Sequence, residues 1–198
     1  MGQVLPAERR HEISVEETMR NYRARTLKHS PSKLLTQELG PLPRAELDAL
    51  ADSLVVIALE YEPGDPEEKK SMADGAVFNL RFSSRAREGS EPYPGALDRL
   101  IQIIENSKAG SIRRSALEGV ANVPDTARAI AYLGKVAAAG REEEDGFLVG
   151  SAIYSLANEL GPRGLEFLHQ LYKEGRLTHP HFAASRMIGQ VRYLNGWD

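Results

Sequence analysis

Apolar residues recur along this chain at the spacing of an α-helix, and short runs of glycine and proline interrupt them. The pattern is strongest between residues 44 and 61, where apolar side chains fall at i, i+3, i+4 and i+7. They are Leu47, Leu50, Ala51, Leu54, Ile57 and Ala58. No stretch alternates apolar and polar residues as a half-buried strand would. We therefore predict an all-α protein of about eight to ten helices without a sheet.

Two predicted helices precede a corner rich in glycine and proline. Ser14 and Glu17 form a capping box, in which each side chain satisfies a backbone donor at a helix start. This box predicts a helix through about residue 27, and a second, short helix ends at Gly40. The chain is therefore expected to comprise an N-terminal helical arm, residues 1–42, and a helical repeat domain, residues 43–198.

The later helices begin at proline or at residue types that cap helix N-termini. They are predicted at residues 66–85, 97–104, 112–122, 126–139, 146–160, 162–173 and 178–194. The expected N-caps are Asp65, Ser111, Asp125, Asp145 and Thr178. In the helix at 146–160, the residues predicted to face inward are Val149, Ala152, Ile153, Leu156, Ala157 and Leu160.

One sequence pattern occurs twice between residues 112 and 171. In each copy a serine and an alanine are followed by aliphatic positions and then by an Ala-Asn pair. Ala116 and Ala152 occupy equivalent places, 36 residues apart, and so do Asn122 and Asn158. Repeated helical units of this length cannot bury an apolar face alone and stack on their neighbours. The repeat therefore predicts an α-solenoid.

The repeated residues resemble a known family. Ile112, Arg113 and Ala116, followed by a tight turn at Asp125, are similar to the short bacterial HEAT repeat. The stretch from Leu148 to Leu168 resembles it without the arginine, and 182–191 is a degraded third copy. The resemblance covers roughly residues 95–194. It implies a short right-handed solenoid of HEAT-like helix pairs, and it specifies no single activity.

Stacking converts the repeat offsets into rows of side chains. Glu118, Tyr154 and Arg186 should align on successive second helices, which in a HEAT-like stack line the concave surface. Aromatic and arginine side chains are enriched in binding hot spots. The predicted binding residues are Glu118, Asn122, Tyr154, Asn158, Arg186, Gln190, Arg192 and Tyr193. The alternative interpretation is that these are ordinary polar positions bonded to neighbouring helices.

Charge is unevenly distributed, although the net charge is only −3. Residues 1–33 carry seven Lys or Arg against four Glu, which leaves −6 for the rest of the chain. An acidic run occupies Glu142 to Asp145. The basic arm could dock on its own body, on a protein partner or on nucleic acid, or it could be a solvated helix face.

The sequence shows no set of residues that indicates catalysis. Cysteine is absent, which excludes disulfides and thiol chemistry. His179 and His181 are the only clustered histidines, and at a helix start they point to different sides without a further ligand nearby, so we predict no metal site. There is no nucleophile elbow and no glycine-rich phosphate loop, and hence no predicted catalytic residue or cofactor.

No apolar run reaches the roughly 18 to 20 residues that cross a bilayer. The first six residues, Met1 to Pro6, also lack the apolar core of a secretion signal. These patterns predict a cytoplasmic protein without a membrane partner.

Three functions are compatible with these patterns. The leading prediction is a non-enzymatic scaffold, adaptor or immunity-type module that grips a segment of another protein on its concave face. A nucleic-acid-binding protein would use the basic arm together with the arginines of the groove, Arg113, Arg114, Arg186 and Arg192. A lyase or glycosylase is the weakest prediction, implied only by the range of HEAT proteins.

Overall fold

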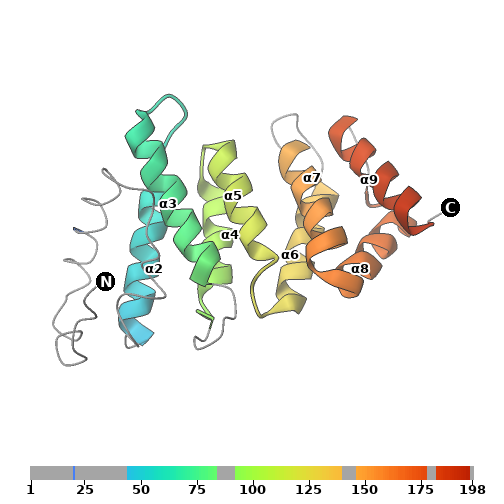
Figure 1. Cartoon of the computed structure of the whole chain (residues 1–198), viewed down its shortest axis with the longest axis horizontal. Helices are drawn as coiled ribbons and strands as arrows, with labels where there is room; N and C mark the ends of the chain where they lie inside the picture. Colours follow the sequence, from blue (N-terminus) through green and yellow to red (C-terminus); the bar gives the residue numbers. More distant parts are fainter. Residues whose placement is uncertain (1–19, 21–43, 84–91, 140–145, 178–181, 197–198) are drawn as a thin grey trace, which may run out of the picture.

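A computed structural model of the chain describes residues 20, 44–83, 92–139, 146–177 and 182–196 (Figure 1). Within these ranges the chain forms eight α-helices and one π-helical turn, without a strand, which confirms the all-α prediction there. The elements are α2 Arg44–Leu59, α3 Glu67–Ser83, α4 Ala96–Asn106, α5 Gly110–Val120, α6 Thr126–Ala139, α7 Gly146–Tyr154, η3 Ser155–Glu159, α8 Gly161–Lys173 and α9 Phe182–Asn195. The two helices predicted before Gly40 lie outside the described residues.

The helices form two layers along the long axis of the molecule (Figure 1). In one layer α3 packs on α5, α5 on α7, and α7 on α9. In the other layer α2 packs on α4, and α6 packs on α8. Between the layers α2 packs on α3, α4 on α5, and α6 on α7. Each pair of consecutive helices is therefore set beside the next pair.

Apolar side chains from both layers form one core. The largest fully buried side chains are Leu50, Leu54, Leu80, Leu97, Leu100, Ile103, Ile112, Leu117, Leu133, Ile153 and Leu156. Ala116 and Ala152, the equivalent alanines of the two copies, are both completely buried. Small side chains at these places let α5 and α7 approach their neighbours closely.

Ion pairs connect neighbouring helices of the even-numbered layer. Arg128 of α6 lies 2.5 Å from Asp98 of α4, and Lys135 lies 3.3 Å from Glu105. Because both pairs are exposed, solvent and salt screen them, and each adds little to stability. Both pairs span 30 residues, so they fix the position of α6 along α4.

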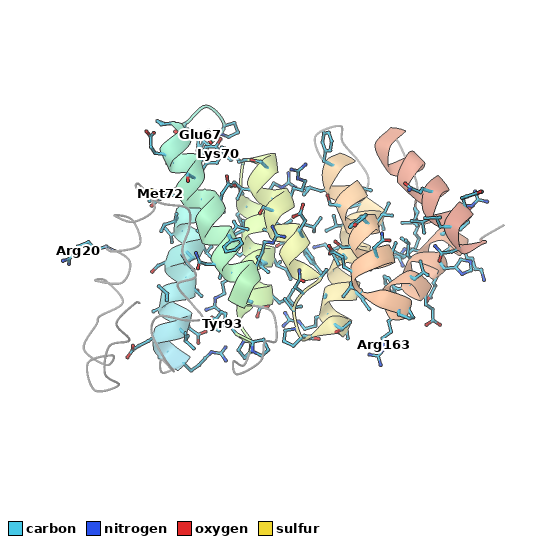
Figure 2. The ribbon with its side chains drawn as sticks, viewed as in Figure 1. Arg20, Glu67, Lys70, Met72, Tyr93 and Arg163 are labelled. Atoms are coloured by element: carbon cyan, nitrogen blue, oxygen red, sulfur yellow. The ribbon has the colours of Figure 1, made fainter. Side chains whose placement is uncertain are left out.

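Tyr93 joins the start of α4 to α2 (Figure 2). Its hydroxyl donates a hydrogen bond to Asp48, and its ring lies between the guanidinium groups of Arg44 and Arg99, at 5.3 and 5.6 Å from the ring centre. The hydrogen bond from Tyr93, together with Arg44 and Arg99, lowers the pKa of Asp48. Burial raises the pKa of Tyr93. These contacts hold the residues that precede α4 against α2.

A second tyrosine makes stability depend on pH. Burial raises the pKa of Tyr132 to about 12, and the charge of Glu105 adds to the rise, whereas an unfolded tyrosine has a pKa of about 10. The stabilisation from this group is therefore complete below about pH 10 and is lost as the pH rises towards 12. Between pH 9 and 11.5 the parent should lose about 1–2 kcal/mol more unfolding free energy than Tyr132→Phe.

Urea unfolding at both pH values measures this difference. A Tyr193→Phe variant is the control, because the side chain of Tyr193 is 87% exposed and the change removes an exposed hydroxyl instead of a half-buried one. Equal losses in the parent and in Tyr132→Phe would show that Tyr132 is not protected by the fold.

The structure confirms one of the N-cap residues predicted from the sequence and contradicts two others. Asp125 caps α6 as predicted, since its carboxylate accepts a hydrogen bond from the Arg128 amide at 3.2 Å. Ser111 is not a cap, because α5 begins earlier and Ser111 lies inside it. Asp65 is not the N-cap of α3, because α3 begins at Glu67; its carboxylate accepts from the Glu62 amide at 2.8 Å and pairs with the Lys69 side chain at 2.8 Å. Asp145 and Thr178 lie outside the described residues.

The predicted helix at 146–160 is interrupted by the π-helical turn. The Leu160 amide donates to the Ser155 carbonyl at 3.1 Å, a bond that spans five residues instead of four. A wider turn rotates the residues within it and after it away from α-helical register. Consequently Ala157 and Leu160 are only half-buried, although the sequence predicts them to face inward. The other four predicted inward residues of this helix are buried: Val149, Ala152, Ile153 and Leu156.

Candidate binding cleft between α5 and α7

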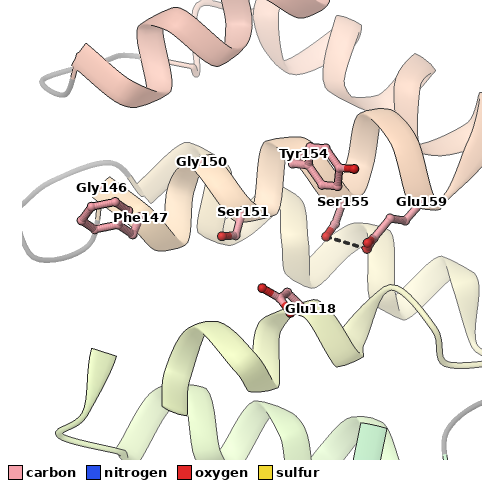
Figure 3. Close-up of a pocket in the computed structure, with 8 residues that line it drawn as sticks. All are labelled: Glu118, Gly146, Phe147, Gly150, Ser151, Tyr154, Ser155 and Glu159. Atoms are coloured by element: carbon pink, nitrogen blue, oxygen red, sulfur yellow. Dashed lines mark hydrogen bonds between the residues drawn. The ribbon is translucent and has the colours of Figure 1, made fainter. Parts of the chain in front are cut away.

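A cavity of about 360 Å³ opens between α5 and the helix formed by α7 and η3 (Figure 3). It is lined by Glu118, Gly146, Phe147, Gly150, Ser151, Tyr154, Ser155 and Glu159. A second cavity of about 280 Å³ shares Phe147 and is lined by Gly110, Ser111, Arg114 and Leu148 as well. Residues at the start of α5 share the second cavity with residues at the start of α7, so the two helices run in the same direction. The two cavities lie along α5 between residues 110 and 118, about 12 Å at 1.5 Å per residue, and are called the cleft below.

Two aromatic side chains of α7 project at the cleft. Phe147 is 72% exposed and Tyr154 is 49% exposed. They are seven residues apart, which is two helical turns, and therefore lie on one face of α7. Figure 3 shows them at opposite ends of the cavity. Large exposed apolar side chains that gather at a cavity are typical of interaction sites.

Gly150 forms the wall of the cavity between the two aromatic residues (Figure 3). The glycine itself is buried, yet a Cβ atom placed on it would meet no atom within 4 Å. A glycine inside a helix costs about 0.5–1 kcal/mol relative to alanine. The absence of a side chain here keeps the cavity open.

On the α5 side of the cleft, Glu118 takes part in a charged network. Its Oε2 lies 3.2 Å from Nη2 of Arg81 on α3, and its Oε1 lies 4.0 Å from Nε of Arg114. Arg81 also donates a hydrogen bond to Ser115 at 3.2 Å. The carboxylate of Glu118 therefore has two arginines as charged neighbours.

The π-helical turn supplies the polar groups on the α7 side. The Ser155 hydroxyl, almost completely buried, donates to Oε2 of Glu159 at 2.9 Å (Figure 3). Glu159 is exposed and makes no ion pair with any residue that the structure describes. Single π turns within α-helices are frequent at functional sites. The cleft thus combines an apolar slot with an acidic edge.

The structure brings together two of the residues that the repeat aligns. Glu118 and Tyr154 face the same cavity from α5 and α7. Asn122 and Asn158 do not line it. Their side-chain amides donate to the carbonyl groups four residues earlier, those of Glu118 and Tyr154, at 2.9 and 3.0 Å. These bonds satisfy carbonyl groups near the C-terminal ends of their own helices.

Three of the predicted residues, Gln190, Arg192 and Tyr193 of α9, are not among the residues that line the cleft. Gln190 and Tyr193 are exposed, and the guanidinium of Arg192 lies over the ring of Tyr172, 4.8 Å from its centre. The side chain of Arg186 lies outside the described part of the structure. Arg113 donates to the Ile104 carbonyl at 3.0 Å and so fastens α5 to the end of α4.

The sequence prediction missed six residues of the larger of the two cavities: Phe147, Gly150, Gly146, Ser151, Ser155 and Glu159. A signal for the first two was present, because Phe147 and Tyr154 are seven residues apart with a glycine between them. Ser155 and Glu159 carry no comparable signal, since they enter the cavity through the π turn.

No protein-family model, curated protein or solved structure matches the chain. Across the described ranges, no group of three or more His, Asp or Glu side chains is placed to hold a metal ion. In the same ranges, no helix combines the length and the apolar character needed to cross a bilayer.

Proposed function

We propose that the chain is a non-enzymatic protein-binding module, a short right-handed solenoid of HEAT-like helix pairs, and that the cleft between α5 and α7 holds a segment of another protein. The proposal rests on the exposed aromatic residues Phe147 and Tyr154, which line an open cavity. Between them the wall of the cavity is formed by Gly150, which has no side chain. The 36-residue repeat and the two layers of stacked helix pairs support the solenoid.

The dimensions of the cleft favour a peptide segment. A cleft of about 12 Å accommodates two turns of a helix or about four extended residues. Grooves between parallel helices bind amphipathic segments through large apolar side chains spaced one or two turns apart. One such side chain would enter the cavity over Gly150, between Phe147 and Tyr154. Aromatic residues that line such a pocket carry much of the binding energy in protein interfaces.

Nucleic acid is less well supported at this site. Arg81 and Arg114, the arginines nearest the cleft, share the carboxylate of Glu118. Glu118 and Glu159 would repel phosphate groups that entered from the solvent.

Filling the cavity should abolish binding without unfolding the protein. We would select ligands from a phage-displayed library of random twelve-residue peptides on the immobilised parent and measure the affinity of the enriched peptides by fluorescence anisotropy. Gly150→Leu should weaken their binding at least tenfold, because the new side chain occupies the cavity and no atom within 4 Å opposes its Cβ. The helix itself should tolerate leucine better than glycine.

Two surface variants on the even-numbered layer serve as controls. Lys135→Glu on α6 and Gln170→Glu on α8 lie at exposed positions away from the cleft and should leave affinity unchanged. Thermal unfolding of each variant verifies that it is folded. Equal binding by the parent and by Gly150→Leu would contradict the proposed site.

A further inference from the structure

We infer that the segment bound in the cleft carries a basic residue next to its apolar anchor, and that Glu159 receives this residue beside the ring of Tyr154. The inference rests on the proposed function and specifies the chemistry of the partner.

The first argument is that the two carboxylates in the cavity, those of Glu118 and Glu159, have different neighbours. Glu118 already has Arg81 and Arg114 as charged neighbours. Glu159 has only the Ser155 hydroxyl as a polar contact among the residues that are described, and it is exposed. A hydroxyl donor orients a carboxylate without neutralising it. Glu159 is therefore available to a cation from solvent.

The π turn explains why an acid and an aromatic ring meet at this place. Residues five apart in a regular α-helix differ by about 140° in direction, so Tyr154 and Glu159 would face different sides. The π turn adds one residue to the turn. Both side chains consequently line one cavity, as Figure 3 shows. A lysine or arginine held by Glu159 would also be attracted to the face of the exposed tyrosine ring.

The surrounding charge also favours a basic segment. Among the residues that the structure describes, the only cationic side chain that lines the cleft is Arg114, which lies close to Glu118. Complementary charge increases the rate and the specificity of association.

Two synthetic probes test the inference. Both are fluorescein-labelled twelve-residue peptides with two leucines four positions apart, and they differ only in whether the residues next to the leucines are arginine or glutamate. In 50 mM NaCl the arginine peptide should bind about tenfold more tightly than the glutamate peptide. Glu159→Gln should reduce this preference to about threefold or less, and so should 300 mM NaCl, because salt screens exposed charges.

Glu166→Gln is the matched control, since Glu166 is an exposed glutamate of α8 that does not line the cleft. It should keep the tenfold preference. If both peptides bind equally and both are lost in Gly150→Leu, the cleft is the site and the inference about charge is wrong. A preference for the glutamate peptide would overturn the inference in the same way. If neither peptide depends on Gly150, the proposed function itself fails.

Discussion

Replacing Gly164 with alanine should lower the free energy of unfolding by about 2–3 kcal/mol, although the change adds only one methyl group. A Cβ atom on Gly164 would lie 2.3 Å from the carbonyl oxygen of Leu156 and 2.8 Å from Cβ of Leu160. The nearest group is therefore backbone of the π turn. It cannot move aside without opening the hydrogen bonds of the turn or shifting α8.

Alanine substitutions at two other glycines serve as comparisons for Gly164→Ala. On Gly134, a Cβ would lie 2.2 Å from the ring of Phe167, which is half-buried and can rotate, so Gly134→Ala should cost less than Gly164→Ala. Gly150→Ala meets no atom within 4 Å and should stabilise the protein by up to about 1 kcal/mol, because alanine favours a helix over glycine. Urea unfolding gives all three values. A Gly164→Ala variant as stable as Gly150→Ala would contradict the packing of α8 on the π turn.

Ala152→Phe should be destabilising by about 1–3 kcal/mol or more. Ala152 is completely buried on α7, which packs against α5, α6 and α9. A phenyl ring at this position has no space at native packing density and must separate α7 from its neighbours. Differential scanning calorimetry should therefore record a clearly lower melting temperature than that of the parent.

The neighbouring residue provides the control. Ser151 is half-buried and lines the cavity, so the ring of Ser151→Phe can extend into open space. That variant should melt within a few degrees of the parent while blocking the cleft. If Ala152→Phe also melts like the parent, the alignment of Ala116 with Ala152 in the two copies is wrong.

Two of the residues that the repeat offset aligns lie in the cleft, whereas most of the cleft lining was not predicted from the sequence. Because residues 36 positions apart occupy equivalent places on stacked helices, Glu118 and Tyr154 were expected in one row, and they line one cavity. The same offset aligned Asn122 with Asn158, but both amides bond to their own helices. The position in the repeat therefore predicts which residues are aligned. Hydrogen bonds to the backbone of the same helix determine which of the aligned side chains can still bind a partner.

The π turn could not have been predicted from apolar spacing. The periodicity of Val149, Ala152, Ile153 and Leu156 fits a regular helix, and these residues are buried as expected. The turn that begins at Ser155 is stabilised by packing against α8, a contact between elements that a local pattern does not contain. Glu159 therefore entered the site through tertiary structure.

Site-specific photo-crosslinking tests the central claim most directly. A benzoylphenylalanine in place of Phe147, an exposed aromatic residue that lines the cleft, adds no new ring to the cavity, and the same residue in place of Gln170 lies on α8 in the other layer. With the arginine peptide as probe, the cleft position should form a crosslink that excess unlabelled peptide suppresses, and the α8 position should form none. A crosslink from the α8 position alone, or equal crosslinks from both, would contradict binding between α5 and α7.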